Sequence, residues 1–297
     1  MSLRTGALAQ TRTGARRRAR SPLRRLAPLL WHLPMIAGTV VLSVPLAWLL
    51  STSLKLEGRE FVVPPEWIPN PIVWENYPRA MTTLPFYLYF WNTLIVTLGS
   101  LSGTLLTASM AAFAFARLRF PGRGFLFVLL LSTLMLPQAV TLIPKFITFR
   151  YLGWINTLNP LWVPWWFGGG AFNVFLLRQF LMTLPHELDE AARIDGASNW
   201  RIYWSVLMPL CRPALITVAI FTFIHSWNDF LEPLIYLHDA KLRTLALGLR
   251  GFQDLYATQW TLMMAASAVI IAPVLLLFFV CQRYFIRGIH LTGLAGR

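Results

Sequence analysis

The chain has 297 residues, of which 56% are hydrophobic and only 13% are charged, and its formal net charge is +14. A soluble domain carries about 25% charged residues, so this composition indicates a protein surrounded by lipid. The net charge alone would suit a nucleic-acid-binding protein. The position of the charges excludes nucleic acid as a partner, because eight arginines lie together in residues 1–25 before a long apolar run. Such a tail is typical of a cytoplasmic membrane anchor.

After the basic tail, 1–25, we expect one transmembrane domain over residues 26–297. A helix needs roughly 20 residues to cross about 30 Å of hydrocarbon. Five runs without Lys, Arg, Asp or Glu reach this length, and a sixth run is interrupted by Asp229 and Glu232. The sequence therefore predicts an all-α membrane protein with six transmembrane helices. They are expected near residues 29–50, 91–116, 125–143, 161–181, 213–237 and 262–285.

The distribution of Lys and Arg predicts the orientation. With six crossings, the segments on the side of the N-terminus hold eighteen basic residues and the opposite segments hold eight. Cytoplasmic segments carry the excess of basic residues, so we predict that both termini are cytoplasmic. The first apolar run is too long for the core of a typical signal peptide, and we expect it to be retained.

Proline and glycine mark expected interruptions. Pro85 is expected to separate an external surface segment, residues 85–90, from the second crossing, and Pro137 is expected to kink the third. Gly99 and Gly103 form a small-xxx-small pair, which serves either packing within the chain or a specific dimer contact. The glycines 168–170 permit either a hinge or close packing.

A polar block, residues 183–212, separates the fourth and fifth apolar runs. On a helical wheel, one face of its first helix carries Leu184, Leu188, Ala191 and Ala192, and the other carries Asp189, Glu190 and Arg193. Gly196 stands where a helix C-cap favours a positive φ, and a second short helix is expected over 198–207. The small alanines suit insertion into a groove of a partner protein. The alternative is an amphipathic helix that rests on lipid, although four acids disfavour an anionic leaflet.

The spacing within this block is distinctive. It reads Glu190-Ala191-Ala192, three residues, Gly196, nine residues, and Val206-Leu207-Met208-Pro209. This resembles the EAA loop of binding-protein-dependent ABC importer permeases, which usually have Ile and Leu where this chain has Val206 and Met208. Both differences conserve apolar character. Further similarity to the sugar-type branch, and to the smaller of its two unequal permeases, extends over a core of about residues 88–286. It is carried by residues 92–96, 112–117, 119–122, 142–144, 176–180, 226–230 and 282–288.

This resemblance implies a type I ABC importer permease fold in a bacterial or archaeal inner membrane. It implies import of a sugar or related polyol together with a second homologous permease in a heterodimer, two ATPase subunits and an external or periplasmic substrate-binding protein. The residues expected to couple the chain to the ATPase are Glu190, Ala191, Ala192, Arg193, Asp195, Gly196 and Pro209. ATP and Mg would be used by the ATPase, and no cofactor is expected in this chain.

The chain is not expected to be an enzyme. None of its three lysines, Lys55, Lys145 and Lys241, follows a glycine, so a phosphate-binding loop with Gly-Lys-Ser/Thr is missing. The histidines share no helical face, and no spacing of metal ligands is present. Energy for transport would therefore come from another polypeptide.

Ionisable residues within an apolar run are candidates for function. Asn228, Asp229 and Glu232, with Trp227 one position before Asn228, could line a translocation path or an outer gate. Asp229 lies about 24 Å along the fifth run, near the outer boundary, so a solvated helix end is an equal alternative. His225 is expected to be buried and hydrogen-bonded.

Three other functions remain open at this point. The cargo could be a phosphate ester, a polyamine or a peptide. A secondary transporter or channel would need ions or broken helices near the midplane, where this sequence has few charges. A membrane-anchored interaction protein without transport is the third alternative.

Overall fold

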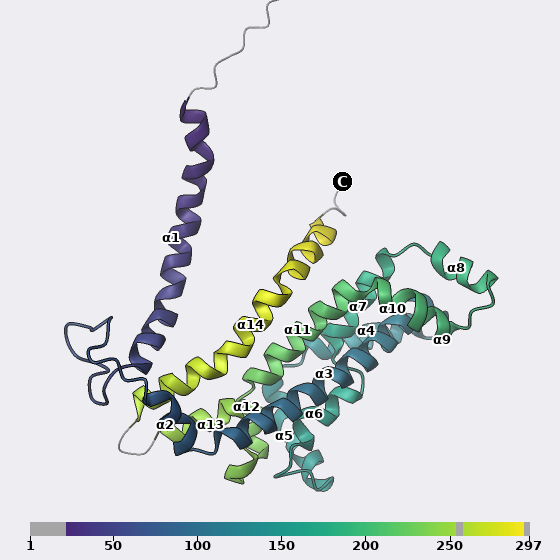
Figure 1. Cartoon of the computed structure of the whole chain (residues 1–297). Coiled ribbons are helices and arrows are strands. Elements are labelled where there is room, and N and C mark those ends of the chain that lie inside the picture. The colour runs from purple at the N-terminus through teal and green to yellow at the C-terminus, as the bar shows by residue number, and fades with distance from the viewer. Residues whose placement is uncertain (1–21, 254–257, 294–297) are drawn as a thin grey trace, which may run out of the picture. The chain divides into compact units, whose positions relative to one another are not determined.

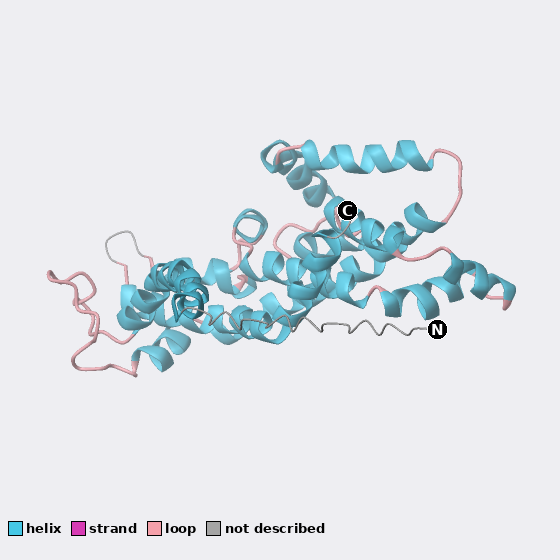
Figure 2. Ribbon diagram, turned by 90° about the horizontal axis from the view of Figure 1, so that it is seen from above, coloured by secondary structure: helices cyan, strands magenta, loops and turns pink. Residues whose placement is uncertain are grey.

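The computed structural model describes residues 22–253 and 258–293, with side chains for 32–253 and 258–282. Most of the basic tail, residues 1–21, lies outside this range. In the described residues the regular elements are all helical (Figure 2), and the only bridge between extended residues joins Gln253 to Thr258. The chain divides after Trp48 into two units. The described part of the first unit belongs to α1 (Pro22–Ser53), whose residues 32–44 are exposed.

The second unit contains the remaining helices, drawn in Figure 1. In chain order they are α2 (Asn76–Thr83), α3 (Phe86–Arg117), α4 (Arg123–Ser132), η1 (Thr133–Met135), α5 (Gln138–Tyr151), α6 (Asn159–Trp162), η2 (Val163–Trp166), α7 (Ala171–Thr183), α8 (Glu187–Ile194), α9 (Asn199–Arg201), η3 (Ile202–Leu207), α10 (Met208–Leu210), α11 (Arg212–Asn228), α12 (Leu231–Tyr236), η4 (Ala240–Leu242), α13 (Leu245–Gly248), η5 (Leu249–Phe252) and α14 (Trp260–Gly293).

Three of the six expected crossings are continuous apolar helices. These are the last 22 residues of α1, the whole of α3, and residues Trp260–Gln282 of α14. Two bent pairs also have the necessary composition, so the described residues contain three helices able to span a membrane by length, or up to five if each bent pair counts as one. The start of α3 corrects one expectation. Residues 86–90 belong to this helix and form no separate surface segment, because Pro85 is accommodated directly before its first turn.

The other three expected crossings are interrupted. The third bends by 102° between α4–η1 and α5, since Pro137 has no N–H with which to continue the helix. The fourth retains only the 13 residues of α7, about 20 Å of helix. The fifth ends at Asn228, and Asp229 is extended before α12 begins. Single helices over 125–143, 161–181 and 213–237 were therefore the wrong expectation.

Helix α3 is the central element of the second unit, and it runs beside α7 and α11 (Figure 1). The largest hydrophobic core fills the space between these helices and η3–α10. A second core lies toward the other end of α3, among α2, α13, η5 and α14. Both cores bury long stretches of α3, which explains why its 32 residues stay helical without a break.

The glycines on α3 serve packing within the chain. A Cβ on Gly99 would lie 3.0 Å from the ring of Trp162, and a Cβ on Gly103 would collide with Trp166. Trp166 Nε1 also donates a hydrogen bond of 3.0 Å to the Gly99 carbonyl. Because two indoles fill the small-residue stripe, the packing interpretation is confirmed for this pair.

Candidate functional site

The polar block begins with α8, which Figure 1 shows set off from the ends of α7 and α10. Three acids, Glu187, Asp189 and Glu190, occupy its first turn, where they complement the positive end of the helix dipole. Gly196 follows the helix with φ +77°. The Gly196 N–H donates to Arg193 O, and the Ala197 N–H donates to Ala192 O. This is the hydrogen-bond pattern of a Schellman C-cap, so the predicted glycine turn is confirmed.

The second helix of the block is also present, over residues 199–210. Ser198 caps it by accepting a hydrogen bond from the Arg201 N–H at 3.4 Å. Its middle part, η3, is a π-helix, a wider turn than the expected α-helix. Pro209 is exposed near the end of this helix, which meets α11 at an angle of 79°.

The two faces of α8 differ from the predicted wheel. Glu190 and Ala191 are exposed, and Ile194 is 86% exposed. Ala192 instead packs against the main core, and Asp189 is buried. The predicted wheel grouped Ala191 with Ala192 on one face and Asp189 with Glu190 on the other, and the structure separates the members of both pairs. The outward surface of α8 combines a carboxylate with small and apolar side chains.

Asp189 is buried because it pairs with Arg117, the last residue of α3. Asp189 Oδ2 lies 3.3 Å from Arg117 Nη1, and the two side chains are 9% and 1% exposed. Arg117 Nη2 donates to the carbonyls of Leu181 and Leu184, each at 2.8 Å, and Nη1 is 2.6 Å from His186 Nδ1. One guanidinium thus joins the ends of α3 and α7 to α8. Arg117 and Asp189 were not among the predicted site residues.

The remaining residues of the block lie at its surface. Arg193 is exposed and donates to Asn199 Oδ1 at 3.4 Å, so it ties α8 to the start of the second helix. Asp195 is exposed beside the glycine turn. A Cβ on Gly196 would meet nothing within 4 Å, so this glycine is required only by its backbone conformation.

The residues predicted to line a translocation path or gate are brought together only in part. Asp229 Oδ1 accepts from the Glu232 N–H at 3.4 Å, and Glu232 Oε1 pairs with Lys145 Nζ of α5 at 3.1 Å. Asn228 bonds to its own helix, at Ile224 O. Trp227 is buried in the second core and donates to Ile270 O, so it points toward α14.

His225 and Lys145 add to this region. His225 is exposed and meets the ring of Trp165 edge-on at 5.4 Å between centroids, so the expectation of a buried histidine is wrong. Lys145 was not predicted, because nothing in the sequence places it beside Glu232. No cluster of three or more potential metal-binding residues occurs in the described part of the chain.

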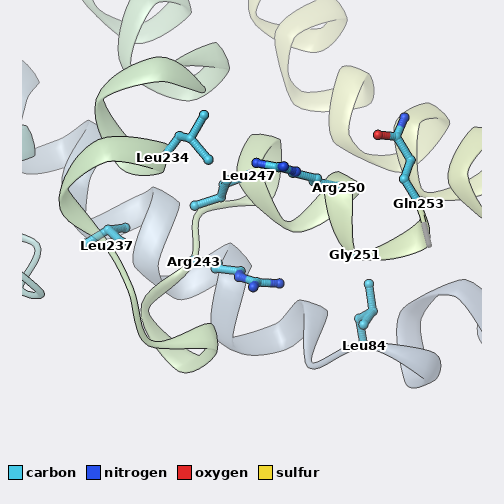
Figure 3. Close-up of a pocket in the computed structure, with 8 residues that line it drawn as sticks. All are labelled: Leu84, Leu234, Leu237, Arg243, Leu247, Arg250, Gly251 and Gln253. Carbon is cyan, nitrogen blue, oxygen red and sulfur yellow. The ribbon is translucent and has the colours of Figure 1, made fainter. Parts of the chain in front are cut away.

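A cavity of about 400 Å³ lies at the end of the unit opposite α8 (Figures 1 and 3). Figure 3 shows the side chains of Arg243 and Arg250 bordering it, with Leu247 between them and Gln253 at its edge. The lining is completed by Leu84, Leu234, Leu237 and Gly251. This end of the unit carries the loop expected outside the membrane.

The chain is similar to known proteins over most of its length. The diacetylchitobiose uptake system permease protein NgcG of Streptomyces coelicolor is 34% identical over 90% of this chain and 88% of its own. The sn-glycerol-3-phosphate transport system permease protein UgpE of Yersinia enterocolitica is 32% identical over 90% of this chain and 97% of its own.

The fold matches solved transporters. A chain in the crystal structure of a bacterial ABC transporter involved in the import of the acidic polysaccharide alginate superposes with a TM-score of 0.79 and 23% identity, covering 90% of this chain and 99% of its own. Residues 103–291 match the family described as binding-protein-dependent transport system inner membrane component. The chain therefore belongs to this family of ABC importer permeases.

Proposed function

We propose that the chain forms half of the translocation path of an ATP-driven importer and couples to a separate ATPase through the outward face of α8. The observation that carries the coupling role is the exposure of Glu190, Ala191 and Ile194 on a short helix that ends in a glycine turn. Such a surface fits a groove on a protein partner. Closure of the ATPases would move α8 and switch the path between inward-facing and outward-facing states.

A second homologous permease, two ATPase subunits and a substrate-binding protein complete the proposed assembly. Family membership supports the binding protein, and an alginate transporter with a similar fold was solved in complex with a pentasaccharide-bound periplasmic protein. ATP and Mg would be bound by the ATPase subunits. The proposed place of the assembly is a bacterial or archaeal inner membrane.

The proposed cargo is a sugar or related polyol. The relatives are named for diacetylchitobiose, sn-glycerol-3-phosphate and sulfoquinovosyl glycerol, which are sugar or polyol derivatives. Asn228, Asp229 and Glu232 lie at the break between α11 and α12, where polar groups would form an outer gate. Trp227 would support this gate from behind by holding α11 against α14.

The chain is proposed to cross the membrane six times, with α4–η1–α5 and α11–α12 as interrupted crossings and both termini in the cytoplasm. The excess of basic residues on one side supports this orientation. A phosphatase fused to the C-terminus, active only outside the cytoplasm, is expected to stay inactive, while a fusion after Gly153 is expected to be active. The reverse pattern would contradict the orientation.

The coupling role predicts a specific loss of assembly. Ala191→Trp places a large ring on the outward face of α8, where the exposed alanine leaves space for a partner. We expect the variant to reach the membrane at wild-type levels but to lose the ATPase during purification. Thr183→Trp, also exposed but outside α8, is the control. Retention of the ATPase by the Ala191 variant would leave the lipid-resting helix as the better account.

A further inference from the structure

We propose that Arg117 and Asp189 form the joint that carries movement of α8 to α3 and α7, which makes them positioning residues for coupling. The inference rests on the proposed function of α8. In the described residues, this ion pair is the only side-chain polar contact between α8 and a long helix. Without it, α8 would be held by apolar contacts, by its two flanking loops and by the bond from Arg193 to Asn199 of the short second helix.

The two loops that flank α8 do not by themselves couple its movement to α3 and α7. On one side, Leu184 is extended and connects α7 to His186, and on the other side Gly196 adopts a left-handed turn. The first link is three residues long, and the second joins α8 to the short second helix. Neither link fixes the middle of α8 to α3, so the helix can still tilt about its two ends. The joint removes this freedom, because it fixes Asp189 in the middle of α8 to the end of α3.

Arg117 is well suited to this task. Its Nη2 donates to the carbonyls of Leu181 and Leu184 at the C-terminal end of α7, where the last carbonyls of a helix lack the usual partner one turn later. Leu181 O also accepts from the Leu184 N–H at 3.3 Å. Its Nη1 reaches His186 and Asp189. A planar guanidinium can hold several acceptors in fixed directions, whereas a lysine ammonium acts as a flexible point charge.

The surroundings of the pair make separation costly. Arg117 and Asp189 are both buried, and Leu184, Ala192 and Ala197 pack against the core around them. Breaking a buried ion pair leaves an uncompensated charge in a medium of low dielectric constant. When α8 shifts, it is therefore easier for α3 and α7 to move with it than for the ion pair to break.

The pair also has unused hydrogen-bonding capacity. Arg117 Nε and Asp189 Oδ1 are buried, and each lacks a hydrogen-bond partner among the described residues. A carboxylate can bind an arginine through two parallel hydrogen bonds, which would occupy both atoms. The joint can thus change from the present single contact to a forked contact and remain engaged while α8 tilts.

The test uses the complete complex, with the second permease, the ATPases and the binding protein, reconstituted into vesicles. It measures ATP hydrolysis with and without the binding protein. The binding protein stimulates the ATPase from outside, so its signal must pass from the long helices through the ion pair to α8, opposite to the movement that ATP drives. For Asp189→Asn and Arg117→Lys we expect normal assembly and basal hydrolysis, with stimulation reduced at least about fivefold. The matched controls are Glu187→Gln in α8 and Arg119→Lys in the turn directly after α3, which change exposed residues and should keep full stimulation.

Stimulation within about twofold of wild type in both joint variants would overturn the proposal. If Asp189→Asn fails to accumulate in the membrane, the stimulation measured for Arg117→Lys decides the test, because that variant retains the positive charge. Loss of both variants from the membrane would show that the pair serves folding, and this would also overturn the proposal. Failure of the underlying function looks different. In that case Ala191→Trp keeps the ATPase bound, whatever the joint variants do.

Discussion

Gly196→Asp is expected to reach the membrane at near-normal levels and yet to lose at least about tenfold in substrate uptake and in binding-protein-stimulated ATP hydrolysis. Gly196 has φ +77°, a conformation in which any Cβ costs roughly 1 kcal/mol. The new carboxylate would also join the acids of the block, which are Glu187, Asp189, Glu190 and Asp195. The site lies outside the apolar runs, so insertion should survive while the position of α8 changes.

Gly122→Asp is a closely matched control. Gly122 has φ +78°, and a Cβ there also meets nothing within 4 Å, so the backbone cost and the added charge are the same. It precedes α4 in the other turn expected on the cytoplasmic side. Its effect on uptake should be clearly milder. Normal uptake by the Gly196 variant would remove the polar block from its coupling role.

Gly169→Ala should destabilise the protein by about 2–4 kcal/mol, through a strained backbone and a steric clash together. Gly169 has φ +63°, and a Cβ there would lie 2.7 Å from Ala108 Cβ and 2.9 Å from both Ala108 N and Thr104 O. These are largely backbone atoms in the buried part of α3, which cannot yield. The midpoint of thermal unfolding in detergent measures the effect.

Gly168, the neighbouring glycine, allows the effect of backbone strain on stability to be separated from the effect of the steric clash. Gly168 has φ +107°, but a Cβ there would meet nothing within 4 Å. Gly168→Ala therefore keeps the backbone strain and omits the clash, and it should lower the midpoint much less than Gly169→Ala. Equal losses would show that contact between the glycine turn and α3 is unimportant. The same measurement decides between the two interpretations of residues 168–170, packing and hinge.

The part of the candidate site that is local in sequence could be predicted from it. The C-cap glycine and the serine cap of the next helix act within a few residues, and both Gly196 and Ser198 lie where cap chemistry favours them. The orientation of α8 could not be predicted in this way. Asp189 is drawn inward by Arg117, which lies on a distant helix, and a helical wheel contains no information about that partner.

The interrupted crossings show a similar limit. Uncharged runs reveal which segments are compatible with lipid, and α1, α3 and α14 match them well. The runs do not reveal where a helix breaks. Pro137 gave a signal for the bend before α5, but the extended Asp229 has no proline or glycine beside it. The local signal there is the Asp229 side chain itself, whose Oδ1 accepts a hydrogen bond from the Glu232 N–H at 3.4 Å and so caps the start of α12.

Site-specific photo-crosslinking from α8 tests the central claim most directly. A benzophenone amino acid would replace Ala191, which is exposed, in the assembled transporter. The account predicts a crosslink to the ATPase subunit. It predicts no such crosslink from the same probe at Tyr151, which is 89% exposed and lies at the end of α5 that is proposed to face outward. Crosslinks from position 191 to lipid alone would contradict the account.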